Sequence, residues 1–383
     1  MKVIISIDQI KPPLTGVGRY SYELVKALRN LPQIESLRYF RGTGFDTDLV
    51  RVQGQAGRLT GFGRRLLAAP GAIDLYRKIT AFRQTRVLRN FEDHLFHGTS
   101  FYLPPFPGRS VVTIHDLSPF VWPECHPPER VRYMEVEVGR SVERASLLIT
   151  VSEFTREQVA KYFGKPLDEI RAVPLASASS FFPREKKQLE ACLNKHGLAY
   201  QRYSLFVGTI EPRKNLLVLL DAYERLPARL RNQWPLVLTG YRGWRSEGIH
   251  ARIAQGVRAG WVKYLGFVDG EDLPLLYAGA WLFVFPSLYE GFGLPVLEAM
   301  SSGIPVVCSR SSSLPEVAEG VALMCEANDV DALTESIKRA LEDDSWRVKA
   351  ILAGLVKSRN YSWPRCAQAT ADIYVSALRK SGS

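Results

Sequence analysis

The sequence predicts an α/β protein with two domains, each built around a parallel sheet that is covered by helices. Short apolar runs typical of buried strands alternate with amphipathic runs of helical period along the chain. A chain of 383 residues is long for a single domain. The alternation breaks near 175–200, where the polar, proline-bounded stretch PLASASSFFPREKKQ indicates a linker or hinge.

The alternation assigns elements to both halves. We expect a first domain at 1–178, a linker at 179–200, a second domain at 201–360 and a last helix at 361–383. In the first half the strands are KVIISI, HLFHG, SVVTIH and LLITVS, and the helices lie at about 17–30, 128–145 and 153–164. In the second half the strands are YSLFVGT, PLVLTG, VKYLGFV, WLFVFPS and PVVCS, and the helices lie at about 215–226, 248–258, 271–279, 294–302, 329–343 and 346–358.

The segment PSLYEGFGLPVLEAM at 286–300 follows a predicted strand and carries the strongest functional signal. Glu290 and Glu298 are eight positions apart, with a glycine loop and the start of an apolar helix between them. Loop amides and the positive end of a helix bind phosphate, and glycine lets the backbone approach closely. This corner therefore suits a ligand that carries both a diphosphate and sugar hydroxyls. The alternative interpretation is a pair of solvated glutamates at a helix start.

Two loops in the first half also follow predicted strands, and open parallel sheets bind ligands at the carboxyl ends of their strands. Gly16 and Gly18 precede a helix after KVIISIDQI, within reach of a phosphate or sugar; a flexible loop is the alternative. His115 and Asp116 follow SVVTI. A histidine beside a carboxylate can donate or accept a hydrogen bond in a cleft, although a lone histidine is more often structural.

In the second half, Arg213 and Lys214 follow the strand YSLFVGT and precede a helix. A cationic pair at a helix start opposes the helix dipole, so it favours a bound anion at that point. A diphosphate is the obvious anion, because arginine can bind it through two parallel hydrogen bonds. Ordinary surface charge is the alternative.

The ordered motifs TGVGRY, TIHD, GTIEPRKN, PSLYEGFGLPVLEAM and YSWPRC span both halves. Together they resemble the retaining glycosyltransferases of family 4, which have the GT-B fold: two Rossmann-like domains that face each other across a cleft, with a C-terminal helix that crosses back to the first domain. The combination looks most like bacterial mannosyl- and rhamnosyltransferases of O-antigen and polysaccharide assembly. It departs from the family at Thr209, where an arginine is common, so Arg213 and Lys214 must supply that charge.

The resemblance assigns roles to the loop residues. Glu290 faces the donor sugar, His115 contacts that sugar, and Glu298 binds the ribose hydroxyls. Gly16 and Gly18 belong to a glycine-rich donor loop. Backbone groups near Phe267 and Val268 line the nucleobase, and the amides of Phe292, Gly293 and Leu294 bind sugar and phosphate.

The resemblance also implies a reaction. A hexose, mannose or rhamnose, would pass with retention from a GDP-sugar to a lipid-linked saccharide, with a UDP-sugar as the alternative donor. Arg213, Lys214 and the loop amides would stabilise the leaving diphosphate, so no metal or other cofactor is expected.

Composition bears on location and partners. The net charge is +11, and region 41–90 holds ten arginines or lysines against three aspartates. This region could bind an anionic membrane or be a solvated surface. A non-enzymatic adaptor on membrane or nucleic acid would explain the charge but not the loops, and no nucleic-acid motif is present. Five scattered cysteines, an N-terminus that reads as a strand, and the lack of a long apolar run predict a cytoplasmic protein on the inner membrane face.

Overall fold

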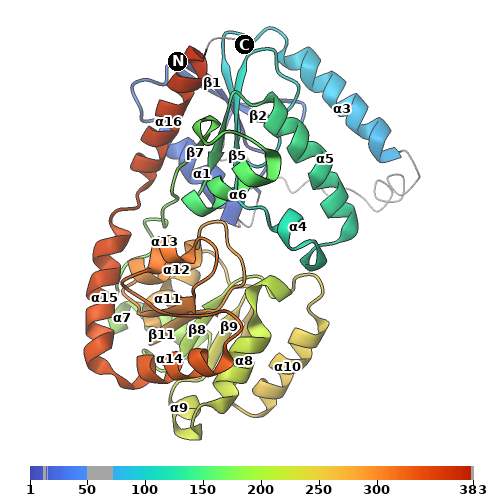
Figure 1. The fold of residues 1–383 in the computed structure, drawn as a ribbon. Coiled ribbons are helices and arrows are strands. Elements are labelled where there is room, and N and C mark those ends of the chain that lie inside the picture. Colours follow the sequence, from blue (N-terminus) through green and yellow to red (C-terminus); the bar gives the residue numbers. More distant parts are fainter. Residues whose placement is uncertain (12–13, 15, 50–71, 381–383) are drawn as a thin grey trace.

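The computed structural model describes residues 1–11, 14, 16–49 and 72–380, and side chains within 72–77 are not described. It consists of two α/β domains stacked one above the other (Figure 1). Each domain contains one mainly parallel sheet with helices packed against it. The predicted fold class is therefore confirmed.

The first domain has a seven-stranded sheet in the order β3-β2-β1-β4-β5-β6-β7, parallel except for the β2–β3 pair. Its strands are β1 (Lys2–Ser6), β2 (Ser36–Arg41), β3 (Gly44–Asp46), β4 (Leu95–Gly98), β5 (Arg109–Ile114), β6 (Leu147–Thr150) and β7 (Ile170–Ala172). Its helices are α1 (Gly16–Leu28), α3 (Ala72–Leu88), α4 (Ser118–Val121), α5 (Pro128–Arg144) and α6 (Glu153–Phe163), with 3-10 turns at Pro123–Cys125 and Leu167–Glu169. Strands β4 and β6 are wholly buried, as a strand covered on both faces requires.

The second domain has a six-stranded parallel sheet in the order β10-β9-β8-β11-β12-β13. Its strands are β8 (Ser204–Val207), β9 (Leu236–Thr239), β10 (Val262–Gly266), β11 (Leu282–Phe285), β12 (Val306–Ser309) and β13 (Leu323–Cys325). Its helices are α7 (Lys186–Lys195), α8 (Leu216–Arg225), α9 (Ala228–Gln233), α10 (Glu247–Arg258), α11 (Leu273–Gly279), α12 (Leu294–Ser301), α13 (Leu314–Ala318), α14 (Val330–Glu342) and α15 (Asp344–Ser358), with a 3-10 turn at Pro212–Lys214.

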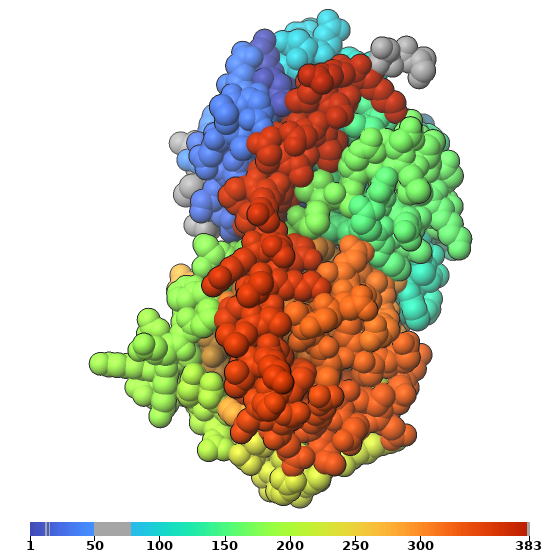
Figure 2. Space-filling view, turned by 60° about the vertical axis from the view of Figure 1, so that its left-hand side comes forward, coloured from blue at the N-terminus to red at the C-terminus, as the bar shows by residue number. Residues whose placement is uncertain are grey.

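The last helix, α16 (Trp363–Arg379), returns to the first domain as expected. Figure 2 shows the C-terminal segment running along both domains, and α16 packs against α1 and β5. His97 on β4 fixes this contact, because its two ring nitrogens lie 2.6 Å from the Tyr374 hydroxyl of α16 and 2.8 Å from the Thr113 hydroxyl. Burial lowers the pKa of His97 to about 3, so the ring stays neutral and structural.

The linker predicted at 179–200 contains a helix. Helix α7 occupies Lys186–Lys195 and packs against α11 of the second domain. Leu189, Cys192 and Leu193 are buried at a helical spacing, a signal that the polar neighbours obscured. This part of the expected linker therefore belongs to the core of the second domain.

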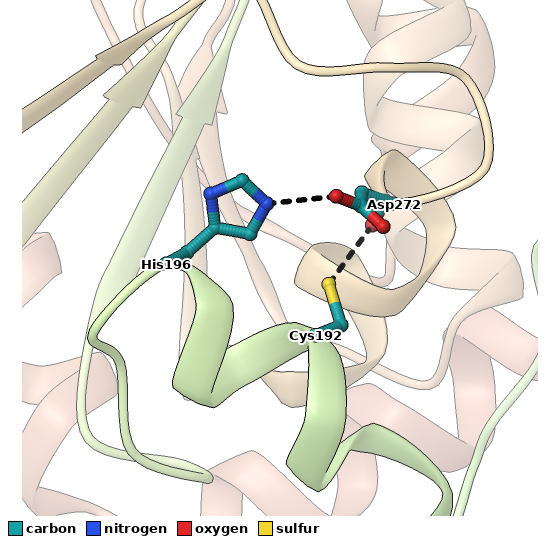
Figure 3. A group of neighbouring side chains, drawn as sticks. All are labelled: Cys192, His196 and Asp272. Atoms are coloured by element: carbon teal, nitrogen blue, oxygen red, sulfur yellow. Dashed lines mark hydrogen bonds and ion pairs between the residues drawn. The ribbon is translucent and has the colours of Figure 1, made fainter.

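A polar group fastens α7 to the start of α11 (Figure 3). His196 Nε2 lies 2.9 Å and Lys195 Nζ 2.7 Å from Asp272 Oδ2, and the Cys192 thiol faces the Asp272 backbone carbonyl at 3.9 Å. Among the described residues, Cys192, His196 and Asp272 form the one group with the spacing of metal ligands. Lys195 already occupies the carboxylate, so we interpret the group as a helix anchor.

Candidate active site

A cavity of about 420 Å³ lies between the domains, and both contribute to its lining. Carboxyl-terminal strand ends and the loops that follow them surround it, as expected for two facing parallel sheets. The lining contains nearly all the residues that the sequence singled out: Gly16, His115, Arg213, Lys214, Phe267, Val268, Glu290, Phe292, Gly293, Leu294 and Glu298.

The loop 286–293 places Glu290 between strand β11 and helix α12. Gly293 precedes the helix with a φ of +102°, a conformation that glycine adopts without strain. Ser287 Oγ donates to Glu290 Oε1 at 2.6 Å, and Ser313 Oγ donates to the Glu290 carbonyl at 2.9 Å. The carboxylate is therefore held in one orientation in the cavity wall.

Glu290 belongs to a buried charge cluster. Lys214 Nζ forms an ion pair with Glu290 Oε1, and Arg213 lies 3.3 Å from Glu290 Oε2. Arg213 also donates to Glu211 at 2.6 Å and to the Tyr289 carbonyl at 2.6 Å. The predicted phosphate-binding pair is thus already partnered by two carboxylates, which the sequence did not reveal.

Glu290 remains a carboxylate despite its burial. Burial acts to raise the pKa of Glu290, but Lys214 and Arg213 outweigh it and hold that pKa below its usual value. Burial lowers the pKa of Lys214, and the neighbouring Arg213 lowers it further. Two cations therefore lie side by side in the cavity wall, and Glu290 and Glu211 balance their charges until a ligand binds.

Glu298 lies on α12 with 6% of its surface exposed. Burial raises its pKa to about 7, although Arg19 of the first domain acts in the opposite direction. Arg19, the arginine of the TGVGRY motif, also lines the cavity. A carboxyl group that titrates near neutral pH is well suited to accept hydrogen bonds from a ligand hydroxyl pair once it ionises.

His115 follows β5 and lines the cavity from the first domain. Its Nε2 lies 2.8 Å from the Thr99 carbonyl, which can only accept, so Nε2 carries the proton. Burial lowers the pKa of His115, so the ring is neutral and Nδ1 is an acceptor. The Tyr20 ring packs edge-on against the imidazole at 4.8 Å between centroids.

The two predicted glycines of the first loop differ. Gly16 lines the cavity, whereas Gly18 is not one of the described residues that line it. A Cβ at Gly18 would lie 2.5 Å from the backbone oxygen of Gln9. Gly18 is therefore required by close packing of the loop, and the geometry gives no support to ligand contact there.

Gly291 joins the two domains next to the site. Its carbonyl accepts hydrogen bonds from Ser152 Oγ at 2.6 Å and Thr155 Oγ1 at 3.1 Å in the first domain. An added Cβ would lie 1.8 Å from the His115 backbone oxygen. Only glycine allows this contact, and the sequence had treated the residue simply as part of the loop.

Tyr241 is a cavity residue that the sequence analysis did not anticipate. It stacks on Phe267 with 4.3 Å between ring centroids and an interplanar angle of 15°. The two rings stay 39% and 42% exposed. A flat, exposed aromatic pair in the cavity wall is suited to bind a planar ring. Tyr241 follows β9, so its position after a strand was the available signal.

Two facing parallel sheets and a cavity lined by cations, carboxylates and aromatic rings are typical of nucleotide-sugar transferases. A family model described as Glycosyl transferases group 1 matches residues 193–354, and one described as Glycosyltransferase Family 4 matches residues 14–176. The O-antigen chain mannosyltransferase B of Escherichia coli is 45% identical over 98% of this chain and 99% of that protein. The serotype-specific mannosyltransferase WbdA of Escherichia coli is 31% identical, over 74% of this chain and 36% of that protein.

Solved structures agree on the fold. The sucrose-phosphate synthase of Thermosynechococcus elongatus superposes with a TM-score of 0.74 at 20% identity, covering 99% of this chain and 100% of that one. The HepE protein of Anabaena, solved with UDP and glucose, superposes with a TM-score of 0.72 at 17% identity, covering 98% of this chain and 100% of that one. The chain therefore belongs to glycosyltransferase family 4 and is a glycosyltransferase with the GT-B fold. This excludes the non-enzymatic adaptor.

Proposed function

We propose that this enzyme transfers a hexose, mannose or alternatively rhamnose, with retention from a GDP-sugar to a lipid-linked saccharide in O-antigen or polysaccharide assembly. The buried cluster of Arg213, Lys214 and Glu290 in the cavity wall carries the proposal, since it provides cations for a diphosphate beside a carboxylate for a sugar. The choice of mannose is supported by the similarity to two mannosyltransferases of Escherichia coli.

In the proposed reaction the bond from the anomeric carbon to the diphosphate oxygen breaks, and a bond to an acceptor hydroxyl oxygen forms on the same face. The hydroxyl proton passes to the departing phosphate. Arg213, Lys214 and the amides at the start of α12 would stabilise the charge that develops on the leaving group. Glu290 would stabilise positive charge on the sugar, and His115 Nδ1 would accept a hydrogen bond from a sugar hydroxyl.

A thermal-shift panel with GDP, UDP, ADP, GDP-mannose and UDP-glucose tests the donor. A ligand that binds only the folded state raises the midpoint temperature, so the guanine compounds should give the largest shifts. The Arg213→Ala/Lys214→Ala double variant should lose these shifts. The matched control is Arg225→Ala/Arg229→Ala, which removes two exposed ion pairs with Asp331 and Glu342. A preference for UDP would overturn the donor, and shifts that persist in the double variant would overturn the phosphate role.

Tyr241→Ala is expected to weaken GDP binding about tenfold, because stacking of a base on an aromatic ring contributes roughly 1–3 kcal/mol. Tyr241→Phe retains the ring and is the matched control. Isothermal titration with GDP measures both. Equal affinities for the two variants would show that the ring pair of Tyr241 and Phe267 does not contact the base.

Nucleotide affinity is expected to fall as the pH drops below about 7, because ribose hydroxyls donate to the ionised form of Glu298. Since burial raises the pKa of Glu298 to about 7, the free protein must ionise this group before it binds. The stability of the ligand-free fold depends on pH in the opposite direction. The protonated form of Glu298 stabilises the fold, and that contribution declines as pH rises from 4.5 to about 7. Titration of GDP between pH 5.5 and 8 checks this prediction. In the two controls, 2′-deoxy-GDP and the Glu298→Gln variant, the affinity should lose the part of its pH dependence that is due to Glu298.

For the acceptor side we propose a peripheral position on the cytoplasmic membrane face. Residues 50–71 of the basic region 41–90 lie outside the described part of the chain, but helix α3 from the same region is informative. Its Ile79 and Phe82 side chains are 44% and 69% exposed, and exposed Arg83 and Arg86 accompany them. Exposed apolar groups beside cations favour an anionic bilayer. Within the described residues, no helix combines the length and apolar character needed to span a membrane.

A further inference from the structure

A second cavity of about 540 Å³ lies in the first domain, separate from the site described above. Its floor is formed by Phe40 and Phe96 of the sheet, and helices α3 and α5 line its sides. Figure 1 shows the two helices on the same side of the domain. The volume is within the range of roughly 300–1,000 Å³ that is common for small-molecule sites. We call this cavity the α3–α5 groove.

Both helices turn a single face to the groove. Helix α5 contributes Tyr133, Glu137, Arg140 and Arg144, at the spacing of one helical face. Helix α3 contributes Lys78, Thr80, Ala81 and Gln84, while its Ile79 and Phe82 side chains are exposed. Each helix therefore lines the groove with one side.

The lining has the chemistry of a saccharide site. The Tyr102 and Tyr133 rings lie 5.5 Å apart between centroids at 62°, and two prolines extend the apolar surface. Apolar rings can cover the C–H face of a sugar, while amide, carboxylate and guanidinium groups bind its hydroxyls. The charges nearly balance, since Arg140 pairs with Glu137 at 2.9 Å, which fits a neutral sugar chain better than a free phosphate.

One loop after β4 connects the groove to the catalytic cavity. Ser100 and Tyr102 line the groove. Their neighbours Thr99 and Phe101 contact His115: the Thr99 carbonyl accepts from His115 Nε2 at 2.8 Å, and the Phe101 ring packs on the imidazole at 5.7 Å between centroids. A chain whose terminal sugar reaches past this loop to the donor would place its preceding sugars in the groove.

We propose that the α3–α5 groove binds the sugars of the acceptor that precede the residue being extended. This rests on the proposed transfer to a saccharide and adds the site that holds the acceptor chain. The outer face of α3 then explains how a lipid-linked acceptor is reached, because one helix forms the groove wall with one face and exposes Ile79 and Phe82 with the other.

Acceptor length distinguishes this site from a general effect on catalysis. With GDP-mannose as donor, kinetics would be compared for octyl α-mannoside and the octyl glycoside of an α-mannosyl trisaccharide. Tyr133→Ala should raise the KM for the trisaccharide at least tenfold. The KM for the monosaccharide and for the donor should stay within twofold. Tyr162→Ala, which removes an aromatic ring of similar exposure on α6, should change none of these values.

Arg140→Gln provides a second variant at an exposed helix position, so folding is not at issue. Saturation-transfer NMR of the trisaccharide needs no donor, and its signal should weaken in both variants. An unchanged trisaccharide KM and NMR signal in both variants would overturn the proposal, as would an equal rise in KM for both acceptors. Failure of the proposed function differs, since the wild-type enzyme would then transfer no mannose from GDP-mannose to either acceptor.

Discussion

Glu290→Gln is expected to reduce sugar transfer about 100- to 1,000-fold while nucleotide binding survives. The substitution keeps the shape of the side chain but removes the negative charge that would face the reacting sugar, and losing one preorganised electrostatic contact has an effect of this size. It also leaves Lys214 without its carboxylate partner and takes one of two from Arg213.

Thermal stability gives an independent prediction for the same variant. Breaking a buried ion pair by removing one partner destabilises a fold by about 3 kcal/mol, because the remaining charge stays buried. A bound diphosphate can replace the missing negative charge. GDP should therefore raise the midpoint temperature of Glu290→Gln by more than that of the wild type. The charge control is Glu224→Gln, an exposed carboxylate that pairs with Arg252 at 2.5 Å. A variant with a full transfer rate would refute the role of Glu290.

Gly291→Ala is the second substitution with a large expected effect. Its Cβ would lie 1.8 Å from the His115 backbone oxygen and 2.9 Å from the carbonyl carbon, and neither atom can rotate away. The loop must shift or the two domains must separate. A displacement of about 1 Å between reacting groups reduces rates roughly 100-fold, so transfer should fall by at least that factor.

The matched control for Gly291→Ala is Gly248→Ala in helix α10, where an added Cβ meets no atom within 4 Å. It should preserve activity and slightly stabilise the helix. Small-angle scattering would test whether the domains of Gly291→Ala move apart, and steady-state kinetics would give the loss of transfer. If transfer by Gly291→Ala stayed within threefold of the wild type, the contact would not control the arrangement of the site.

Much of the fold follows from local patterns. Every strand and helix predicted from a periodic run is present, with ends that differ by at most four residues. The missed strands β2, β3, β7 and β13 are edge strands or lie beside an edge, and three of them have three residues. Such strands carry too few buried positions to produce a clear alternation.

Part of the site could also be predicted from short stretches of sequence. Glu290, Glu298 and the loop between them lie within one strand-loop-helix segment, so their joint position at a sheet edge could be read from residues 286–300. Likewise, His115, Arg213 and Lys214 each follow a strand, and strand ends of parallel sheets meet a common cleft. The sequence alone thus determined the α/β class, the cleft and, apart from Arg19, the charged residues of its lining.

Contacts between distant segments were decided by the tertiary structure. Lys214 and Glu290 are 76 positions apart, and only packing of the second domain makes them a pair. The approach of Gly291 to His115 joins two domains, and the stack of Tyr241 on Phe267 joins two loops. The α3–α5 groove likewise depends on two helices, distant in the sequence, that line the same cavity. Side-chain periodicity reports which face of an element is buried, but it carries no information about which distant residue covers that face.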